Sequence, residues 1–294
     1  MPKPFSLAGL SRREMGAVYE QTLAAEYLRW ARRYIATGGE GYAVELVSGT
    51  EEAPGIAFAG PPGAHVALTF GHGYDGPVEE DLLARIERLH ERTGGTPIIE
   101  VSPYAGEDFV TMLRVGGYGP YEYLHTYAMD LETFEPPEFN VPSGWRMRDV
   151  DKADEDDIDR AVYAIAWGMN GDLPGPTERR LEWARMSAAC PDVRTLIIED
   201  EKGEIVAGSS AGMWFDHPLM PDGNCNLYGG TTMPKARRKG LQSVLMIERL
   251  LWAKEHGCRT ATLDCLPTTG TTRNAERLGF ELLYTKIDLK RPDV

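Results

Sequence analysis

The stretch LYGGTTMPKARRKGLQSVLMIERLLWAKEHG, residues 227–257, contains the pattern that decides the fold. It begins as a strand that ends at Met233, because the proline that follows has no N–H to donate to a ladder. A basic loop with one glycine comes next. Leu241, Val244 and Leu245 then recur at the spacing of an amphipathic helix. This order of strand, basic turn and long helix predicts an α/β unit.

The turn in this stretch has the features of an anion site. Four of the five positions 235–239 are Lys or Arg, in a chain that is acidic as a whole. Gly240 allows the backbone to approach a ligand closely. The amides of residues 241–243 point out of a predicted helix N-terminus, where free N–H groups and the helix dipole favour negative charge. Together these features predict a phosphorylated ligand.

Residues 227–286 resemble the acetyl-CoA-binding core of the GNAT acyltransferase superfamily. The family signature, Gln/Arg-x-x-Gly-x-Gly/Ala at the start of the long helix, corresponds here to Arg237-Arg238-Lys239-Gly240-Leu241-Gln242. Gln242 stands where the family usually has Gly or Ala. Residues 273–280, RNAERLGF, are similar to the second cofactor motif of the family, which ends in a Gly-Phe pair.

The resemblance implies a co-substrate, acetyl-CoA, and a place for each of its parts. The pantetheine arm would enter a wedge between two splayed parallel strands and pair with backbone groups near Thr231 and Met233. Asn274 would contact the coenzyme through its side chain. The pyrophosphate would rest on the turn, whose implied contacts are Arg237, Arg238, Lys239, Gly240, Leu241, Gln242 and Ser243. An amine would then attack the thioester carbon directly, without a covalent enzyme intermediate.

The catalytic acid is less defined by the resemblance. Many family members have a Tyr four residues before the Gly-Phe pair, where this chain has Ala275. Tyr284 and Tyr228, on neighbouring predicted strands, are the candidates to protonate the leaving thiolate. Positioning of the amine and polarisation of the thioester by backbone N–H groups could also suffice. The base stays open by position alone among Asp216, His217 and Glu248.

The two halves of the chain end with the same order of elements. Each has a strand, a Gly-containing loop, a helix, a buried strand, a short helix and a Gly-aromatic pair before its last strands. This predicts an α/β protein with two GNAT-like mixed-sheet domains in tandem, residues 1–135 and 145–294, joined by the Pro-rich linker 136–144. A pair of Tyr-rich strands is expected within residues 121–131.

Composition excludes several classes of protein. The chain has 294 residues, 45 acidic against 31 basic side chains and a net charge of −14, which argues against nucleic-acid binding. No apolar run reaches the length of a membrane span, and the N-terminus lacks a secretory apolar core, so a cytoplasmic protein is expected. The four cysteines form no C-x-x-C pair, and neither they nor the histidines have the spacing of a metal site.

The negative charge lies mainly in the first half. Residues 1–140 carry 10 basic and 21 acidic side chains, and residues 141–294 carry 21 and 24. Acidic residues crowd the start of the first-half helix near position 80, so this half is expected not to bind CoA but to shape the acceptor pocket. Long-range attraction then favours a small cationic amine as the acceptor. A homodimer is compatible with the sequence.

The sequence is also compatible with two other functions. Without the usual Tyr, the chain could be a non-catalytic sensor that binds acyl-CoA. Residues Gly71–Gly76, GHGYDG, also match the dinucleotide pattern G-x-G-x-x-G literally. Pro77 and the acidic residues 79–81 make that segment a poor pyrophosphate site, because like charges about 4 Å apart cost about 1 kcal/mol even in water.

Overall fold

The computed structural model describes residues 5–64, 68–74, 76–169 and 174–292. The first half contains α1 (Arg12–Ala36), β1 (Ala43–Gly49), β2 (Pro54–Ala59), β3 (Leu68–Phe70), α2 (Leu82–Thr93), β4 (Ile98–Val101), α3 (Glu107–Val115) and β5 (Gly119–Asp130). The second contains β6 (Arg146–Asp149), α4 (Glu155–Gly168), α5 (Glu178–Ala188), β7 (Val193–Glu199), β8 (Ile205–Trp214), β9 (Asn224–Thr232), the 3-10 helix η1 (Pro234–Ala236), α6 (Leu241–Glu255), β10 (Thr260–Cys265), α7 (Gly270–Leu278) and β11 (Glu281–Lys290).

Local signals set the ends of these helices. Ser11 accepts from the amide of Glu14 and the Glu14 side chain accepts from the amide of Ser11, which forms a capping box at the start of α1. Asp154 caps α4 in a similar way, through the amides of Asp156 and Asp157. Gly94 ends α2 in the left-handed conformation that a residue without Cβ adopts at no steric cost.

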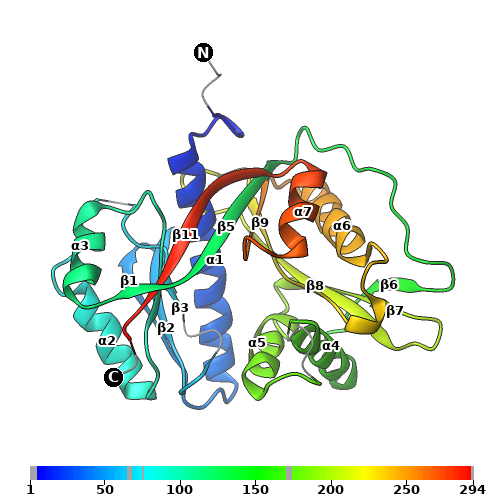
Figure 1. Ribbon diagram of the computed structural model, residues 1–294, viewed down its shortest axis with the longest axis horizontal. Helices are drawn as coiled ribbons and strands as arrows, with labels where there is room; N and C mark the ends of the chain where they lie inside the picture. The colour runs from blue at the N-terminus through cyan, green and yellow to red at the C-terminus, as the bar shows by residue number, and fades with distance from the viewer. Residues whose placement is uncertain (1–4, 65–67, 75, 170–173, 293–294) are drawn as a thin grey trace.

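The strands form one continuous mixed sheet with the order β1-β2-β3-β4-β11-β5-β10-β9-β8-β7-β6 (Figure 1). The last strands of the two halves are exchanged. β11, from the second half, pairs with β4 of the first, and β5, from the first half, pairs with β10 of the second. β5 and β11 also pair antiparallel with each other. The strand pair predicted within residues 121–131 is therefore wrong, since a single strand, β5, runs through this segment.

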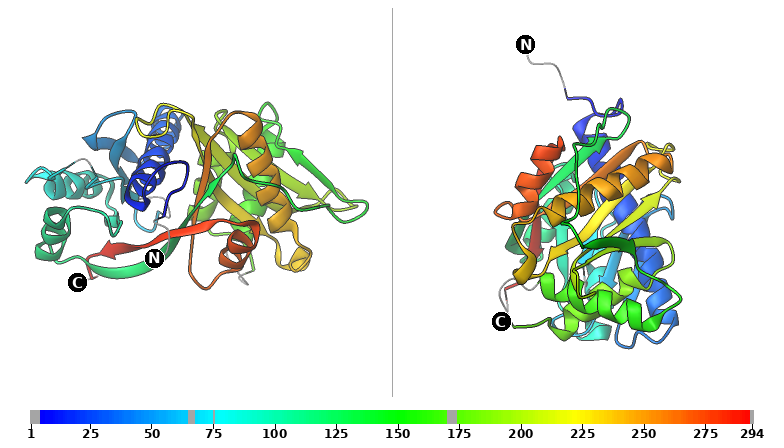
Figure 2. Two further views of the ribbon diagram at one scale, coloured as in Figure 1. Left: turned by 90° about the horizontal axis from the view of Figure 1, so that it is seen from above. Right: turned by 90° about the vertical axis from the view of Figure 1, so that its right-hand side faces the viewer.

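Helices cover both faces of the sheet (Figure 2). One face packs against α1, α4 and α5, which share a hydrophobic cluster. The opposite face is covered by α2 and α3 in the first half and by α6 and α7 in the second. α1 is buried along most of its length because it contacts strands of both halves. Polar side chains of this first-half helix therefore reach the interior of the second half.

Residues 136–144, predicted as a linker, contain no helix or strand and lead from β5 to β6. Within the described residues, no helix is long and apolar enough to cross a membrane.

Candidate functional site

The two central parallel strands of the second half are paired only at their starts. Residues 260–262 of β10 lie opposite residues 224–226 of β9, and the pairing stops there. Side chains alternate along a strand, so residues two positions further on point to the same face. Tyr228 and Asp264, each two positions past the last pair, therefore stand on opposite lips of a wedge and face the same side of the sheet.

A buried polar network holds the apex of this wedge. Asn226 Nδ2 donates to Glu26 Oε1 at 2.8 Å, and Thr262 Oγ1 donates to Asn226 Oδ1 at 2.7 Å. Thr22, also on α1, accepts from Asn226 Nδ2 at 3.1 Å. Burial raises the pKa of Glu26 to about 8, so this carboxyl is largely protonated at neutral pH. Helix α1 thus fixes, through directional bonds, the point where the strands begin to separate.

One lip of the wedge carries a β-bulge. The register between β8 and β9 shifts near Gly229, whose positive φ of 63° suits glycine. Arg249, buried on α6, donates through Nη1 to the carbonyls of Ser210 at 2.7 Å and Tyr228 at 3.2 Å. The guanidinium thus donates to carbonyls of both β8 and β9 at the point where their register shifts. The bulge turns the Gly230 carbonyl toward the wedge, where it accepts from Gln242.

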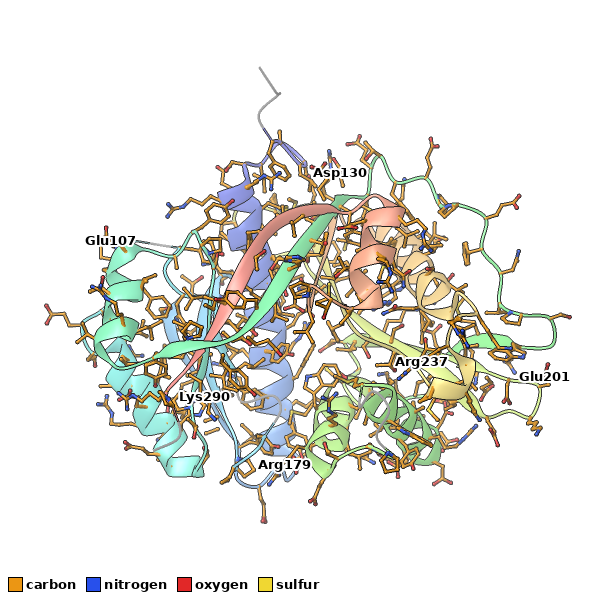
Figure 3. All side chains as sticks on the ribbon, viewed as in Figure 1. Glu107, Asp130, Arg179, Glu201, Arg237 and Lys290 are labelled. Atoms are coloured by element: carbon orange, nitrogen blue, oxygen red, sulfur yellow. The ribbon has the colours of Figure 1, made fainter. Side chains whose placement is uncertain are left out.

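The basic turn before α6 has the backbone of an anion cradle. Arg238 and Gly240 both have positive φ, 65° and 77°, and backbone N–H groups in such turns converge on one point. The amide of Arg237 bonds to the Pro234 carbonyl at 3.4 Å. No hydrogen bond within the described chain uses an amide of residues 238–243, and no side chain caps α6. Figure 3 shows Arg237 at this turn, on the second half of the molecule.

Gln242 does not point away from the turn. Its Nε2 donates to Thr271 Oγ1 at 2.7 Å and to the Gly230 carbonyl at 3.4 Å. Its Oε1 accepts from Asn274 Nδ2 at 2.7 Å. The side chain that stands in place of the family's Gly or Ala thus crosses the wedge, from β9 to α7, and brings Asn274 to the same place.

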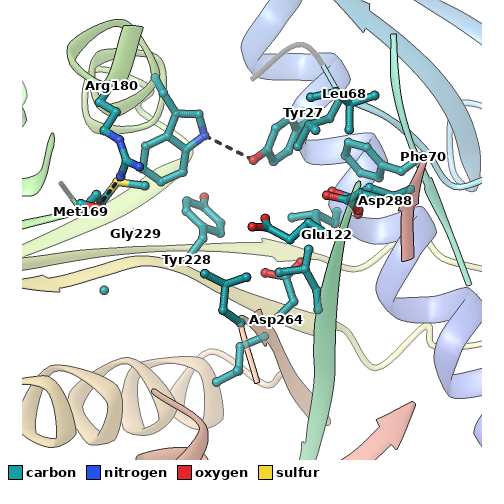
Figure 4. Close-up of a pocket in the computed structure, with 18 of the residues that line it drawn as sticks. Tyr27, Leu68, Phe70, Glu122, Met169, Arg180, Tyr228, Gly229, Asp264 and Asp288 are labelled. Atoms are coloured by element: carbon teal, nitrogen blue, oxygen red, sulfur yellow. Dashed lines mark hydrogen bonds between the residues drawn. The ribbon is translucent and has the colours of Figure 1, made fainter. Parts of the chain in front are cut away.

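A cavity of about 910 Å³ opens from the wedge toward the first half (Figure 4). One end is lined by β9, Gln242 and Arg249. The other end is lined by α1, by β3 and by the exchanged strands β5 and β11. The cavity therefore joins the proposed cofactor wedge to surfaces that the second half alone does not contain.

Carboxylates gather on the first-half side of the cavity. Figure 4 shows Glu122, Asp264 and Asp288 on one side of the space, with Tyr228 across from them. Asp264 Oδ2 lies 2.9 Å from the fully buried Lys286, which also forms an ion pair with Glu100. Burial acts to lower the pKa of Lys286, but the charges of the surrounding carboxylates outweigh it, so the pKa is raised and Lys286 stays positively charged.

The two predicted catalytic tyrosines lie in different places. Tyr228 lines the cavity, and its hydroxyl is buried. The hydroxyl and Glu26 Oε2 both lie directly above Gly212: a Cβ built on this glycine would be 2.9 Å from the hydroxyl and 2.1 Å from Oε2. Tyr284 is not among the residues that line this cavity. It is buried and donates to Glu20 Oε1 at 2.8 Å, which is the arrangement of a structural tyrosine.

The backbone groups of Thr231 and Met233, predicted to pair with the pantetheine arm, face β8 in the structure. The Met233 amide bonds to the Val206 carbonyl at 2.8 Å, so it faces β8 and not the wedge. The N–H and C=O groups of successive residues point to alternate edges of a strand, so Thr231, two residues before Met233, also directs its backbone groups toward β8. Gly230 and Thr232 are left facing outward. Their carbonyls indeed accept from the side chains of Gln242 and Arg237 respectively.

The remaining candidate bases are outside the cavity lining. His217 Nε2 is hydrogen-bonded to Gln21 Oε1 at 3.0 Å, and Glu248 forms an ion pair with Arg194 at 3.1 Å. Asp216 lies in the loop after β8. None of the three is among the residues that line the described cavity.

The literal dinucleotide pattern has a packing role. A Cβ at Gly71 would lie 2.4 Å from the Pro54 carbonyl oxygen, and the Gly73 carbonyl accepts from the Gly106 amide at 3.1 Å. The next helix, α2, begins only at Leu82, so no helix N-terminus follows the last glycine directly. These glycines let a loop pack closely against β2 and the start of α3.

Sequence reasoning missed Asp264, Arg249 and the bulge. The Gly229-Gly230 doublet inside a strand pattern is a recognisable bulge signal. Asp264 is the one charged residue of its strand, TATLDC, which is a weaker signal. Nothing in the sequence around Arg249 distinguishes it from an exposed helix residue, because its carbonyl partners lie 21 and 39 positions away.

Comparison with known proteins shows which family of proteins the second half resembles. Residues 160–280 match the family model described as acetyltransferase (GNAT) family. No curated protein matches the chain. The matched segment includes the wedge, the basic turn and α7, so it covers the parts from which the site is built.

Solved structures extend the likeness to the whole chain. A GCN5-related N-acetyltransferase from Kribbella flavida is 18% identical with a TM-score of 0.55, over 92% of this chain and 96% of that one. A tandem GNAT protein from the clavulanic acid biosynthesis pathway is 14% identical with a TM-score of 0.59, over 97% and 98%. A GCN5-related N-acetyltransferase from Sphaerobacter thermophilus is 17% identical with a TM-score of 0.50, over 81% and 74%. At these identities the likeness concerns the fold, which is the mixed α/β GNAT fold over both halves.

Proposed function

We propose that this protein transfers an acetyl group from acetyl-CoA to the primary amine of a small cationic acceptor, because residues 160–280 match the GNAT family of acetyltransferases, whose members use acyl-CoA. One observation carries the proposal. The pairing of β9 with β10 stops at Asn226, and the resulting wedge opens into the cavity. An enzyme that joins a long thioester to a second substrate needs such a passage through its sheet.

The cofactor's place follows from the free backbone groups. The pyrophosphate would lie on the amides of residues 238–243, which have no acceptor within the described chain. The pantetheine arm would run along the outward backbone groups of Gly230 and Thr232. It would displace the Gln242 amide from the Gly230 carbonyl, a 3.4 Å contact that is long for a hydrogen bond and correspondingly weak.

The chemistry is a direct attack across the wedge. The amine nitrogen forms a bond to the thioester carbon while the C–S bond breaks, and the backbone of the Gly229 bulge stabilises the carbonyl oxygen. A tyrosine hydroxyl carries its proton at neutral pH, and burial raises the pKa of Tyr228 further. Tyr228 is the candidate tyrosine that lines the cavity, and it would give this proton to the leaving thiolate. Asp264, on the facing lip, would orient the amine and receive its proton.

Charge supports the cationic acceptor. The far end of the cavity is lined by three carboxylates, Glu100, Glu122 and Asp288, and by one cation, Lys290. A partly buried space with this surplus of carboxylates attracts cations and is unfavourable for anions. The acidic first half thus contributes two carboxylates inside the cavity, Glu100 and Glu122, in addition to its long-range attraction for a cationic acceptor.

Release of free CoA thiol from acetyl-CoA, measured over a panel of amines, tests the proposal. Turnover that requires a cationic primary amine is the expected result. Preference for neutral or anionic amines would contradict the acceptor class. Tight acetyl-CoA binding with no turnover on any amine would favour the sensor function instead.

A further inference from the structure

Three carboxylates lie in a row across the strand exchange. In the sheet register, Asp288 of β11 is opposite Glu100 of β4 on one side and opposite Glu122 of β5 on the other. Directly opposite residues share a face, and all three line the cavity. β11 belongs to the second half while its two neighbours belong to the first, so the row exists only because the last strands are exchanged.

The charges in this row are not balanced. Glu100 is paired with Lys286. Asp288 is only 5% exposed, and its Oδ1 has no hydrogen-bond partner within the described residues. Glu122 forms no ion pair in the described chain. The ammonium of Lys290, the next residue on the same face, lies over the Tyr121 ring, 5.8 Å from its centroid.

An arrangement of this kind is unfavourable without a ligand. Like charges directly opposite on paired strands destabilise a sheet. Burial, and the charges of Asp264 and Glu122, raise the pKa of Asp288 to about 7, although Lys286 acts in the opposite direction. A cation between Asp288 and Glu122 would relieve both the repulsion and the unpartnered oxygen.

The surroundings define the chemistry of that cation. No group of three His, Cys, Asp or Glu side chains in the described chain is arranged to hold a metal ion. The wall beside the row is apolar and aromatic, with Leu68, Phe70 and Tyr19 among the lining residues. Aromatic faces and alkyl side chains suit an ammonium group carried on a hydrocarbon chain.

We propose that Asp288 and Glu122 bind a second cationic nitrogen of the acceptor, which makes the acceptor a dibasic alkylamine. Its reacting nitrogen lies between the two lips of the wedge, and its other nitrogen lies at the carboxylate row. This inference rests on the proposed function for the identity of the reacting end. The row itself is a binding site whether or not transfer occurs.

Calorimetry without coenzyme tests the row directly, with α,ω-diaminoalkanes from propane to hexane and the monoamine of matching length. We expect at least one diamine to bind about tenfold or more tightly than its monoamine, because its second ammonium forms charge-assisted hydrogen bonds with the carboxylates. Asp288→Asn should reduce this preference to about twofold, and Glu122→Gln, at an exposed position, should reduce it partly. Glu281→Gln, at the far end of β11, is the matched control and should leave it unchanged.

The outcomes separate the two proposals. Equal binding of diamine and monoamine by the wild type, or a preference that survives Asp288→Asn and Glu122→Gln, would overturn the second-nitrogen site. A preference that depends on Asp288, without release of CoA thiol from acetyl-CoA, would keep the site and refute the transfer. Equal thiol release with monoamines and diamines would support the acetyl transfer and refute the second-nitrogen site. Asp288→Asn should also raise the melting temperature, because it removes an unpartnered buried charge.

Discussion

A single carboxylate placed at Gly240 should abolish acetyl-CoA binding while leaving the fold intact. Gly240 begins α6 with φ 77°, and a Cβ built there meets no atom within 4 Å, so an aspartate side chain has room. The left-handed conformation costs a non-glycine residue roughly 1–2 kcal/mol, less for Asp or Asn. A negative charge at a helix N-terminus returns about 0.3–1 kcal/mol of this. The net loss of folding free energy should therefore be small.

The expected loss of affinity is much larger. The new carboxylate would stand where the pyrophosphate meets the amides of residues 238–243, at a separation of about 4 Å. One like-charge pair at that distance costs about 4 kcal/mol near a protein surface, at an effective dielectric constant of about 20. Salt screens part of this. Even a net 3 kcal/mol raises the Kd for acetyl-CoA by more than about a hundredfold.

Calorimetry with acetyl-CoA on three variants separates charge from backbone strain. Gly240→Asn has nearly the same size without the charge and should retain most of the affinity. Gly257→Asp places the same carboxylate at the other end of α6, where the glycine also has positive φ and open space. It should bind acetyl-CoA like the wild type. The reasoning fails if Gly240→Asp binds within about threefold of wild type, or if Gly240→Asn loses as much as Gly240→Asp.

Three further results are expected. Tyr228→Phe should lower kcat by about 10²–10⁴-fold, the usual contribution of a general acid, with the Kd for acetyl-CoA unchanged; an unaltered kcat would remove Tyr228 from the mechanism. Glu26→Gln should match the stability of wild type near pH 4, where the carboxyl is protonated in both the folded and the unfolded chain, and should exceed it at pH 7, because the pKa of Glu26 is raised from 4.5 to about 8 in the folded protein. Between about pH 4.5 and 8 the unfolded wild type releases this proton while the folded protein keeps it, so wild-type stability falls across this window, and denaturant melts at pH 4, 7 and 9 should show an advantage of the variant that grows with pH. Arg249→Met should cost about 2–3 kcal/mol in urea unfolding, because it leaves the buried carbonyls of Ser210 and Tyr228 without their donor.

The basic turn proposed to bind the cofactor was predicted from the sequence because its signals are local. A strand that ends before Pro234, a basic run and Gly240 ahead of an apolar helical repeat are all read within about ten residues. The structure keeps each of them in the predicted place, with η1 as an added turn. The direction of Gln242 was not predictable in this way, since it depends on Thr271 and Asn274 about thirty positions away.

The sequence by itself determined the α/β class, the basic turn before the long helix of the second half and the excess of acidic residues in the first half. Only the tertiary structure decided that β11 lies between β4 and β5. Strand periodicity specifies which face of a strand is buried but not which neighbour it pairs with, so β5 and β11 could equally have stayed in their own halves. Their exchange aligns Glu100, Asp288 and Glu122 along one wall of the cavity. The acceptor end of the site is therefore a property of long-range pairing, while the cofactor end is a property of one continuous segment.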